Sequence, residues 1–154
     1  MPNKDVRKNN KMKIEEKYGN LFENNHLISK HCCYVHCISA DFALGAGIAK
    51  EFQKQFNIRD KLKAQCSSPT DPTCIRIDNV YNLVTKRRCW DKPTYATLRQ
   101  ALKSLKNQCL LDNITTLYMP KIGCGLDRLA WSRVKVMLIE TFKDTEIKIE
   151  VYFI

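Results

Sequence analysis

Long apolar runs are missing from this sequence, and glycine is scarce. No stretch approaches the ~20 consecutive apolar residues that a membrane-spanning helix needs, and the first residues are polar and basic, unlike the apolar core of a secretion signal. These absences predict an intracellular protein, nuclear, cytoplasmic or both, with no membrane partner. The sequence also lacks internal repeats, and 154 residues are enough for one domain but too few for two.

The eight cysteines lack the C-x-x-C spacing of common zinc sites. Imidazole and thiolate groups, the usual zinc ligands, do cluster at His31, Cys32, Cys33, His36 and Cys37. On an extended strand, however, alternate side chains point to opposite faces, so these five cannot converge on one ion. We therefore predict no metal and no cofactor, and we interpret the cysteines as reduced and mostly buried.

Acidic residues are few relative to basic ones. The chain has 26 Lys and Arg against 16 Asp and Glu, which gives a formal net charge of +10. Such a charge attracts polyanions without identifying which one, so nucleotides, nucleic acid and poly-ADP-ribose all qualify as partners. Residues 1–11 have almost nothing to bury and are predicted to form a disordered basic tail, which leaves residues 12–154 as a single domain.

Hydrophobic periodicity predicts short strands alternating with amphipathic helices. We expect strands at residues 12–18, 32–39, 74–78, 80–86, 114–119 and 147–154, and helices at 48–56, 58–65, 94–109 and from about 128 to 142. The i, i+4, i+8 spacing of Ile48, Phe52 and Phe56 predicts that all three face the core. This alternation is typical of an α/β fold with a mixed sheet covered on both faces.

Two of the predicted strands run into glycine loops followed by helices. Gly45 and Gly47 follow the second strand, and Gly123 and Gly125 follow the fifth. Glycine lets backbone N–H groups approach a ligand closely, and a helix N-terminus favours anions, so two such loops at neighbouring strand ends could hold two phosphates. The residues alone leave open a plainer alternative, in which each loop is a tight turn and Asp127 only caps a helix.

Lys86 ends the predicted strand 80–86 and is followed directly by Arg87 and Arg88. A lysine in a partly desolvated site can act as a nucleophile or carry protons. The alternative is a solvated basic edge, and the sequence pattern by itself favours that alternative.

Three segments together resemble the macrodomain family. They are H-C-I-S-A-D-F-A-L-G-A-G-I-A-K-E-F at 36–52, V-T-K-R-R-C-W-D-K-P-T-Y at 84–95 and M-P-K-I-G-C-G-L-D-R-L-A-W at 119–131. Within that family they look most like the terminal ADP-ribose protein glycohydrolases, also called OARD-type ADP-ribose glycohydrolases, and the similarity runs from about residue 14 to residue 154. The resemblance implies a three-layer α/β/α macrodomain with a central mixed sheet.

The resemblance also implies an activity and a set of residues. It implies a hydrolase that binds ADP-ribose, cleaves ester-linked ADP-ribose from Glu or Asp of modified proteins and deacylates O-acyl-ADP-ribose. Lys86 would be the catalytic nucleophile, attacking the anomeric carbon of the distal ribose, and Asp127 the acid/base. The ADP-ribose-binding residues would be Asn20, Leu21, His36, Ser39, Gly45, Ala46, Gly47, Ile48, Ile122, Gly123, Cys124, Gly125 and Leu126. The implied partners are ADP-ribose and mono-ADP-ribosylated proteins, with poly-ADP-ribose or nucleic acid open through the basic surface, and the chain would act as a monomer.

One position departs from the family pattern. Macrodomains commonly have Gly-Asp after the first strand, where the aspartate accepts a hydrogen bond from the adenine amino group, whereas this chain has Gly19-Asn20. An asparagine oxygen still accepts, but the bond loses its charge assistance. Two further functions stay open: a non-catalytic ADP-ribose reader, for which Lys86 and Asp127 would be unnecessary, and an ADP-ribose phosphate phosphatase.

Overall fold

A computed structural model describes residues 11–154, so residues 1–10 of the predicted basic tail lie outside the described part. The strands are β1 (Lys13–Tyr18), β2 (Cys32–Ser39), β3 (Thr73–Ile77), β4 (Val80–Lys86), β5 (Thr116–Pro120) and β6 (Lys148–Phe153). The helices are the 3-10 helix η1 (Leu21–Leu27) and the α-helices α2 (Gly47–Phe56), α3 (Ile58–Gln65), α4 (Tyr95–Leu111) and α5 (Trp131–Phe142). These elements confirm the predicted alternation of strands and helices.

The strands form one mixed sheet in the order β1-β6-β5-β2-β4-β3. Every neighbouring pair is parallel except β3 and β4, which form the predicted antiparallel hairpin. The five parallel strands therefore end at the same edge of the sheet, and β3 begins there. Because ligands of α/β proteins bind outside the carboxyl ends of the strands, this edge is where a site is expected.

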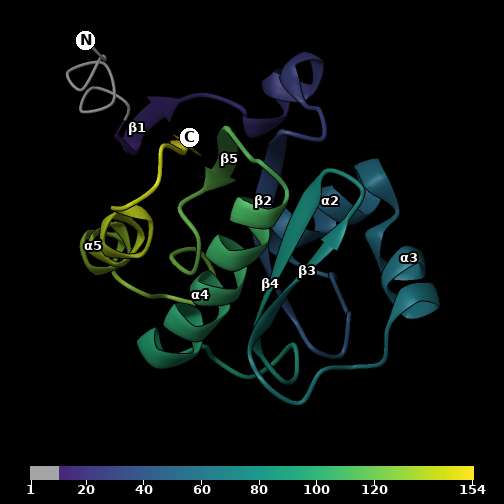
Figure 1. Cartoon of the computed structure of the whole chain (residues 1–154). Coiled ribbons are helices and arrows are strands. Elements are labelled where there is room, and N and C mark those ends of the chain that lie inside the picture. The colour runs from purple at the N-terminus through teal and green to yellow at the C-terminus, as the bar shows by residue number, and fades with distance from the viewer. Residues whose placement is uncertain (1–10) are drawn as a thin grey trace, which may run out of the picture.

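Helices cover both faces of the sheet, which confirms the three-layer α/β/α architecture (Figure 1). On one face, α4 and α5 bury a cluster that includes Leu102 and Leu138 with Leu117 of β5. On the other, α2, α3 and η1 bury a cluster that includes Phe52 and Leu62 with Tyr34 of β2. Removing this apolar surface from water on both faces is the main driving force that holds the layers together.

The best-predicted helix is α4, where Leu98, Leu102, Leu105 and Cys109 are all fully buried. Its start is fixed by Thr94, whose hydroxyl accepts a hydrogen bond from the backbone N–H of Thr97 at 3.1 Å in a reciprocal capping box. Such a cap satisfies backbone donors that a helix start leaves without partners.

Two predictions about helices were wrong in detail. Ile48 does not face the core with Phe52, because its side chain is 37% exposed and lies on the side of α2 that faces the sheet edge. The last helix begins at Trp131 and not near Arg128, because the preceding chain closes a turn in which the Leu129 N–H donates to the Gly123 carbonyl at 2.7 Å. Arg128 has a positive φ of 63°, which is incompatible with an α-helix.

All eight cysteines lie in the described residues, and all are free thiols. Their side chains alternate along β2 as predicted, since Cys33 packs on the α4 and α5 face while Cys32 packs on the opposite one. Residues 11–154 contain no group of three His, Cys, Asp or Glu side chains placed to hold a metal ion. In the same part of the chain, no helix is both long and apolar enough to cross a membrane.

Candidate functional site

A pocket of about 870 Å³ lies at the edge where the parallel strands end. Its walls are the loop between β2 and α2, the loop between β5 and α5, the start of η1 and the end of β6. The predicted ligand residues that line it are Asn20, Leu21, Ser39, Gly45, Ala46, Gly47, Ile48, Ile122, Gly123, Cys124, Gly125 and Leu126. Lys86 and Asp127 line it as well. The structure therefore brings together residues from every part of the chain that the sequence motifs singled out.

The two glycine loops face each other across this pocket. They are neighbours because β2 and β5 are adjacent and parallel in the sheet, so both loops leave the same edge. Gly47 has a φ of +58°, and a Cβ added to it would lie 3.3 Å from Cδ1 of Leu126 in the opposite loop. Gly47 thus adopts a left-handed backbone conformation and also lies close to the opposite loop. Any residue with a Cβ would be strained on both counts.

The loop after β5 folds back so that Gly123 lies close to Leu129. Gly123 has a φ of +73°, and a Cβ there would meet Cδ1 of Leu129 at 3.0 Å. Gly125, in contrast, has no neighbour within 4 Å of such a Cβ and no positive φ. The backbone conformation of this loop therefore requires a glycine at position 123 but not at position 125.

The two loops differ in how a helix follows them. Helix α2 begins at Gly47 inside the pocket lining, its N-cap Ala46 makes no side-chain hydrogen bond, and its first turn has no acidic residue. Its first backbone N–H groups are therefore available to an anion. Helix α5 starts later, its residues are not part of the lining, and the N–H of its N-cap Ala130 already donates to the Tyr95 hydroxyl at 2.9 Å. The predicted anion-binding helix N-terminus is thus present in the first loop and not in the second.

Lys86 and Asp127 meet at one end of the pocket. Lys86 Nζ lies 2.8 Å from Asp127 Oδ1, and the two side chains are only 15% and 16% exposed. Lys86 is the last residue of β4, and Asp127 comes from the loop after β5. Since β2 lies between these strands, the ion pair spans the end of β2. Asp127 does not cap a helix, because the N-cap of α5 is Ala130, so the alternative interpretation of its role as a cap is wrong.

Asp41 links the loop after β2 to the segment that follows Lys86 through hydrogen bonds. Its carboxylate accepts hydrogen bonds from the Ser39 hydroxyl at 2.5 Å and from the Cys89 backbone N–H at 2.9 Å. Its own backbone N–H donates to the Arg87 carbonyl at 3.1 Å. Burial raises the pKa of Asp41, but the hydrogen bonds from Ser39 and Cys89 outweigh it and leave the pKa below its ordinary value. The Ser39 hydroxyl, a predicted ligand group, therefore has its proton engaged by Asp41.

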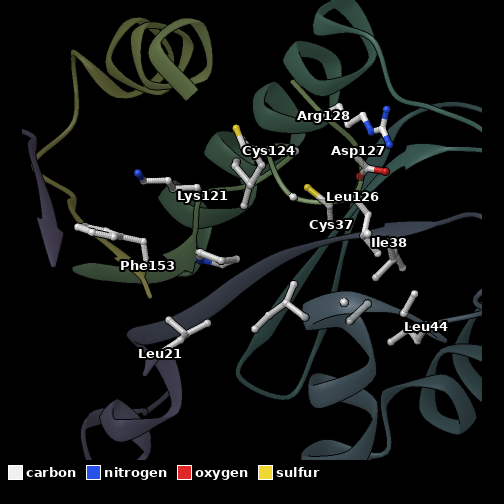
Figure 2. Close-up of a pocket in the computed structure, with 18 of the residues that line it drawn as sticks. Leu21, Cys37, Ile38, Leu44, Lys121, Cys124, Leu126, Asp127, Arg128 and Phe153 are labelled. Carbon is white, nitrogen blue, oxygen red and sulfur yellow. Dashed lines mark hydrogen bonds between the residues drawn. The ribbon is translucent and has the colours of Figure 1, made fainter. Parts of the chain in front are cut away.

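Cys37 and Cys124 place two thiols in the pocket wall near the ion pair (Figure 2). Burial, followed by the negative charge of Asp127, raises the pKa of Cys37 to about 12. Burial likewise raises the pKa of Cys124 to about 11. Both groups are therefore protonated at neutral pH and are poor nucleophiles.

The other end of the pocket is aromatic and basic. Figure 2 shows Phe153 and Lys121 at the end remote from Asp127. Lys121 Nζ lies 4.4 Å from the centre of the Phe153 ring. Asn20 lines this pocket too, and its side-chain oxygen accepts the Phe22 backbone N–H at 2.9 Å, which caps η1. The oxygen that the sequence analysis assigned to adenine therefore already has one local donor.

His36 is not in the pocket, contrary to the prediction. It is fully buried, its ring stacks on Phe52 at a centroid distance of 3.9 Å, and its Nε2 lies 2.5 Å from Asn82 Oδ1. Burial lowers the pKa of His36 to about 4, against the opposing effect of the Asn82 hydrogen bond, so the ring is neutral at pH 7. His36 lies three residues before the end of β2 (39 minus 36), and at that depth its side chain packs under α2.

No protein-family model matches the sequence. The chain is, however, 44% identical over 120 residues to the ADP-ribose glycohydrolase OARD1 of Bos taurus, which covers 77% of this chain and 79% of that protein. The chain belongs to the OARD1 ADP-ribose glycohydrolase family.

Solved macrodomain structures share the fold of this OARD1-family chain. The macrodomain of Thermus aquaticus DarG superimposes with a TM-score of 0.74 at 18% identity, over 93% of this chain and 99% of that one. Thermosipho africanus DarTG, solved in complex with ADP-ribose, gives a TM-score of 0.69 at 19% identity over 91% of this chain and 41% of that one. The macrodomain architecture implied by the sequence motifs is thereby confirmed.

Several lining residues of this OARD1-family pocket were missed from the sequence. They are Cys37, Ile38, Leu44, Cys89, Lys92, Pro120, Lys121, Arg128, Tyr152, Phe153 and Ile154. Lys92 is the most informative of these, because its Nζ donates to the Leu126 carbonyl at 2.8 Å and so ties the second glycine loop to the chain after β4. Phe153 ends the last parallel strand, and that position at the same sheet edge was the signal that could have found it.

Proposed function

We propose that this protein is an ADP-ribosyl hydrolase that binds ADP-ribose in the pocket and releases it from ester links to Glu or Asp side chains. The same chemistry would deacylate O-acyl-ADP-ribose. One observation carries the proposal: an amine and a carboxylate 2.8 Å apart lie in a pocket framed by two glycine loops, in a chain 44% identical to an ADP-ribose glycohydrolase. A module that only binds its ligand needs neither group.

The shape of the pocket suggests how ADP-ribose lies in it. The diphosphate would sit between the loops, where the N-terminus of α2 offers backbone N–H groups and Gly47 and Gly123 permit close approach. The adenine would lie at the end with Asn20 and Phe153, where an aromatic face supports stacking. The distal ribose would then reach Lys86 at the opposite end, beside Asp127, which Figure 2 shows remote from Phe153.

The proposed reaction uses the ion pair in two steps. Asp127 first takes a proton from the Lys86 ammonium group, which frees the amine lone pair. The nitrogen forms a bond to the anomeric carbon of the distal ribose, and the bond from that carbon to the ester oxygen breaks, so the Glu or Asp carboxylate leaves with the electron pair. Water then attacks the same carbon, and the bond from that carbon to the lysine nitrogen breaks with its electron pair going to nitrogen, so Lys86 leaves as a neutral amine. The amine takes back the proton held by Asp127, and the freed carboxylate accepts the proton of the attacking water and passes it to solvent, which restores the ion pair.

Glu-linked mono-ADP-ribosylated protein is the substrate that tests this function. The wild-type chain is expected to release ADP-ribose from it and from O-acetyl-ADP-ribose, and to leave ADP-ribose 1″-phosphate unchanged. Calorimetry with free ADP-ribose should show binding in parallel. Binding without release from either ester would instead mark the chain as a reader, and release of phosphate alone would mark it as a phosphatase.

We further propose that the chain acts as a monomer on mono-ADP-ribosylated proteins in a reducing compartment, nuclear, cytoplasmic or both. Support for the compartment comes from the eight cysteines, all of which are free thiols. A net charge of +10 supports additional attraction to poly-ADP-ribose or nucleic acid. Salt-dependent binding that is lost when residues 1–11 are deleted would support the nucleic-acid part.

A further inference from the structure

A second pocket, of about 430 Å³, lies beside the first at the same edge of the sheet. It lies where β4 ends and β3 begins, and its size is within the roughly 300–1,000 Å³ that is typical of ligand pockets. Its walls are Ala40, the loop at residues 69–72, residues 84–87, 91 and 92, and Thr97 in the first turn of α4. The motif at 84–95 supplies half of these residues, but nothing in the sequence indicated a second pocket there.

Lys86 lines both pockets, and so does Lys92. If the distal ribose lies against Lys86 in the first pocket, the ester bond that breaks is at the boundary between the two. The group on the far side of that bond must then extend away from the ADP-ribose. We propose that the second pocket is the acceptor-side subsite, which takes the leaving carboxylate and the short polypeptide segment that carries it. This inference rests on the proposed hydrolase function.

A buried hydroxyl supports the presence of a ligand in this second pocket. Thr85 lines it and is only 1% exposed, and its Oγ1 has no hydrogen-bond partner among the described residues. Buried polar side chains nearly always have a partner, so the covered Thr85 hydroxyl calls for one, and a ligand in the pocket supplies it once the Thr85 side chain rotates about χ1. A peptide carbonyl or carboxylate can accept from this hydroxyl, and a peptide N–H can donate to it.

The charges of the second pocket suit a polypeptide with an acidic residue beside the modified one. Arg87 lines the pocket, is exposed, and forms no ion pair within residues 11–154. Asp91 is already engaged, because its Oδ2 accepts the Arg88 backbone N–H at 3.0 Å. Arg87 is therefore the cation that is free to pair with a flanking carboxylate.

Other lining residues favour a polypeptide over a nucleic acid. The carboxylate of Asp71 in this pocket can accept hydrogen bonds from peptide N–H groups, whereas a phosphodiester backbone has no donor to offer it. Pro69 and Pro72 add apolar wall on the outer side, which suits side-chain stems better than phosphates. The leaving carboxylate itself would be stabilised as it gains charge by the ammonium group of Lys92 at the boundary, because a nearby cation stabilises developing negative charge.

Three ADP-ribose substrates test the subsite: a peptide with one Glu-linked ADP-ribose and acidic neighbours, the same peptide with lysine neighbours, and O-acetyl-ADP-ribose, which has almost no acceptor. The variants are Arg87→Glu and Thr85→Val. The control is Arg99→Glu, the same charge reversal at an exposed arginine of α4 that lines neither pocket and forms no ion pair within residues 11–154.

Reversing the charge at Arg87 should lower kcat/KM about tenfold on the acidic peptide and raise it on the lysine peptide, since like charges in contact disfavour binding. Thr85→Val should lower kcat/KM on both peptides about threefold through loss of one hydrogen bond. Both variants should leave kcat/KM on O-acetyl-ADP-ribose within about twofold of wild type, because that substrate does not reach the subsite. Arg99→Glu should resemble wild type on all three substrates.

Equal losses on all three substrates, or no change on any while wild type remains active, would overturn the subsite and leave the hydrolase function standing. A wild-type chain that cleaves none of the three would overturn both. An ADP-ribosylated oligonucleotide, assayed in parallel, tests whether the acceptor is a nucleic acid instead of a polypeptide. A selective effect of Arg87→Glu on that substrate alone would overturn the proposal in favour of a nucleic-acid acceptor.

Discussion

Gly47 and Leu126 hold the two glycine loops in contact across the pocket, since a Cβ on Gly47 would lie 3.3 Å from the Leu126 Cδ1. The contact depends on β2 and β5 being adjacent and parallel, which brings residues 79 positions apart in the chain (126 minus 47) to one edge. The spacing of the loops, and therefore the width of the proposed diphosphate site, is set by this close approach.

Gly47→Ala is expected to destabilise the fold by about 1 kcal/mol, because its φ of +58° is costly for any residue with a Cβ. It should also weaken ADP-ribose binding, since Leu126 must move. Denaturant unfolding and calorimetry measure the two effects. Gly45→Ala is the matched control for stability, because a Cβ there meets only the Ala43 carbonyl at 3.9 Å and its φ is not positive.

If Gly47→Ala and Gly45→Ala cost the same free energy of unfolding, the positive φ and the Leu126 contact do not restrict this position. Unchanged ADP-ribose affinity in Gly47→Ala would remove the diphosphate from this part of the pocket.

Gly123→Ala and Gly125→Ala provide a second matched pair, two residues apart in one loop. Gly123 combines a φ of +73° with a Leu129 methyl only 3.0 Å from its potential Cβ, whereas Gly125 has free space. We expect Gly123→Ala to lower the melting temperature by several degrees, at about 1–2 kcal/mol, and Gly125→Ala to leave it within about 1 °C. Thermal unfolding followed by circular dichroism measures both. The reverse order of the two melting temperatures would contradict the turn geometry.

Asn20→Asp is expected to strengthen ADP-ribose binding about threefold to tenfold. The exposed Asn20 side chain lines the end of the pocket that we propose for adenine, and a carboxylate accepts a charge-assisted hydrogen bond that is roughly twice as strong as that of an amide. Aspartate is an equally good N-cap, so η1 should keep its start. Calorimetry with ADP-ribose and with ribose 5-phosphate separates the adenine contribution. Equal affinities for Asn20→Asp and wild type would mean that adenine does not reach this residue.

Much of the fold could be predicted because each element satisfies its own periodicity. Helix α4 repeats buried residues at helical spacing and has a capping threonine, and β3 and β4 are joined by a turn at Asp78, which takes a φ of +51°. The start of α5 could not be read in the same way. Residues 128–130 belong to a turn set by the hydrogen bond from Leu129 to Gly123, which apolar spacing does not reveal.

The pocket residues that belong to local sequence motifs, such as the glycine loops, could be predicted. Those that reach the pocket only through the arrangement of the strands in the sheet could not. The Lys86–Asp127 pair joins positions 41 apart (127 minus 86), and only the sheet order brings them together. His36 was assigned to the pocket from its place in a motif, but depth along β2 decides which side chains reach the edge. For Ile48 the helical spacing predicted the core and the family motif predicted the pocket, and only the second was right, because this residue in the first turn of α2 lines the pocket.

Acid should destabilise the protein through His36. Burial lowers its pKa from 6.5 to about 4, so below pH 6.5 the unfolded chain binds a proton that the folded chain does not. The His36 contribution to stability is therefore complete above pH 6.5 and is lost as pH falls toward 4, at no more than about 1.4 kcal/mol per pH unit. Urea unfolding at a series of pH values from 7.5 to 4.5 measures this slope.

The free energy of unfolding should depend less steeply on pH in His36→Gln, because this variant has no titrating ring at position 36. This expectation holds whatever the absolute stability of the variant. His26→Gln, at an exposed position, controls for removing a histidine and should keep the wild-type slope. Identical slopes in all three proteins would show that His36 takes up its proton equally in the folded and unfolded chain.

The most direct test of the central claim compares wild type with Lys86→Arg and Asp127→Asn on a protein carrying Glu-linked ADP-ribose, with ADP-ribose affinity measured by calorimetry. Arginine keeps the positive charge without a nucleophilic amine, and asparagine keeps the shape without a proton acceptor. We predict that each variant loses at least about a hundredfold in ADP-ribose release while binding ADP-ribose within about tenfold of wild type. Release at the wild-type rate by either variant, or binding without any release by the wild type, would contradict the account.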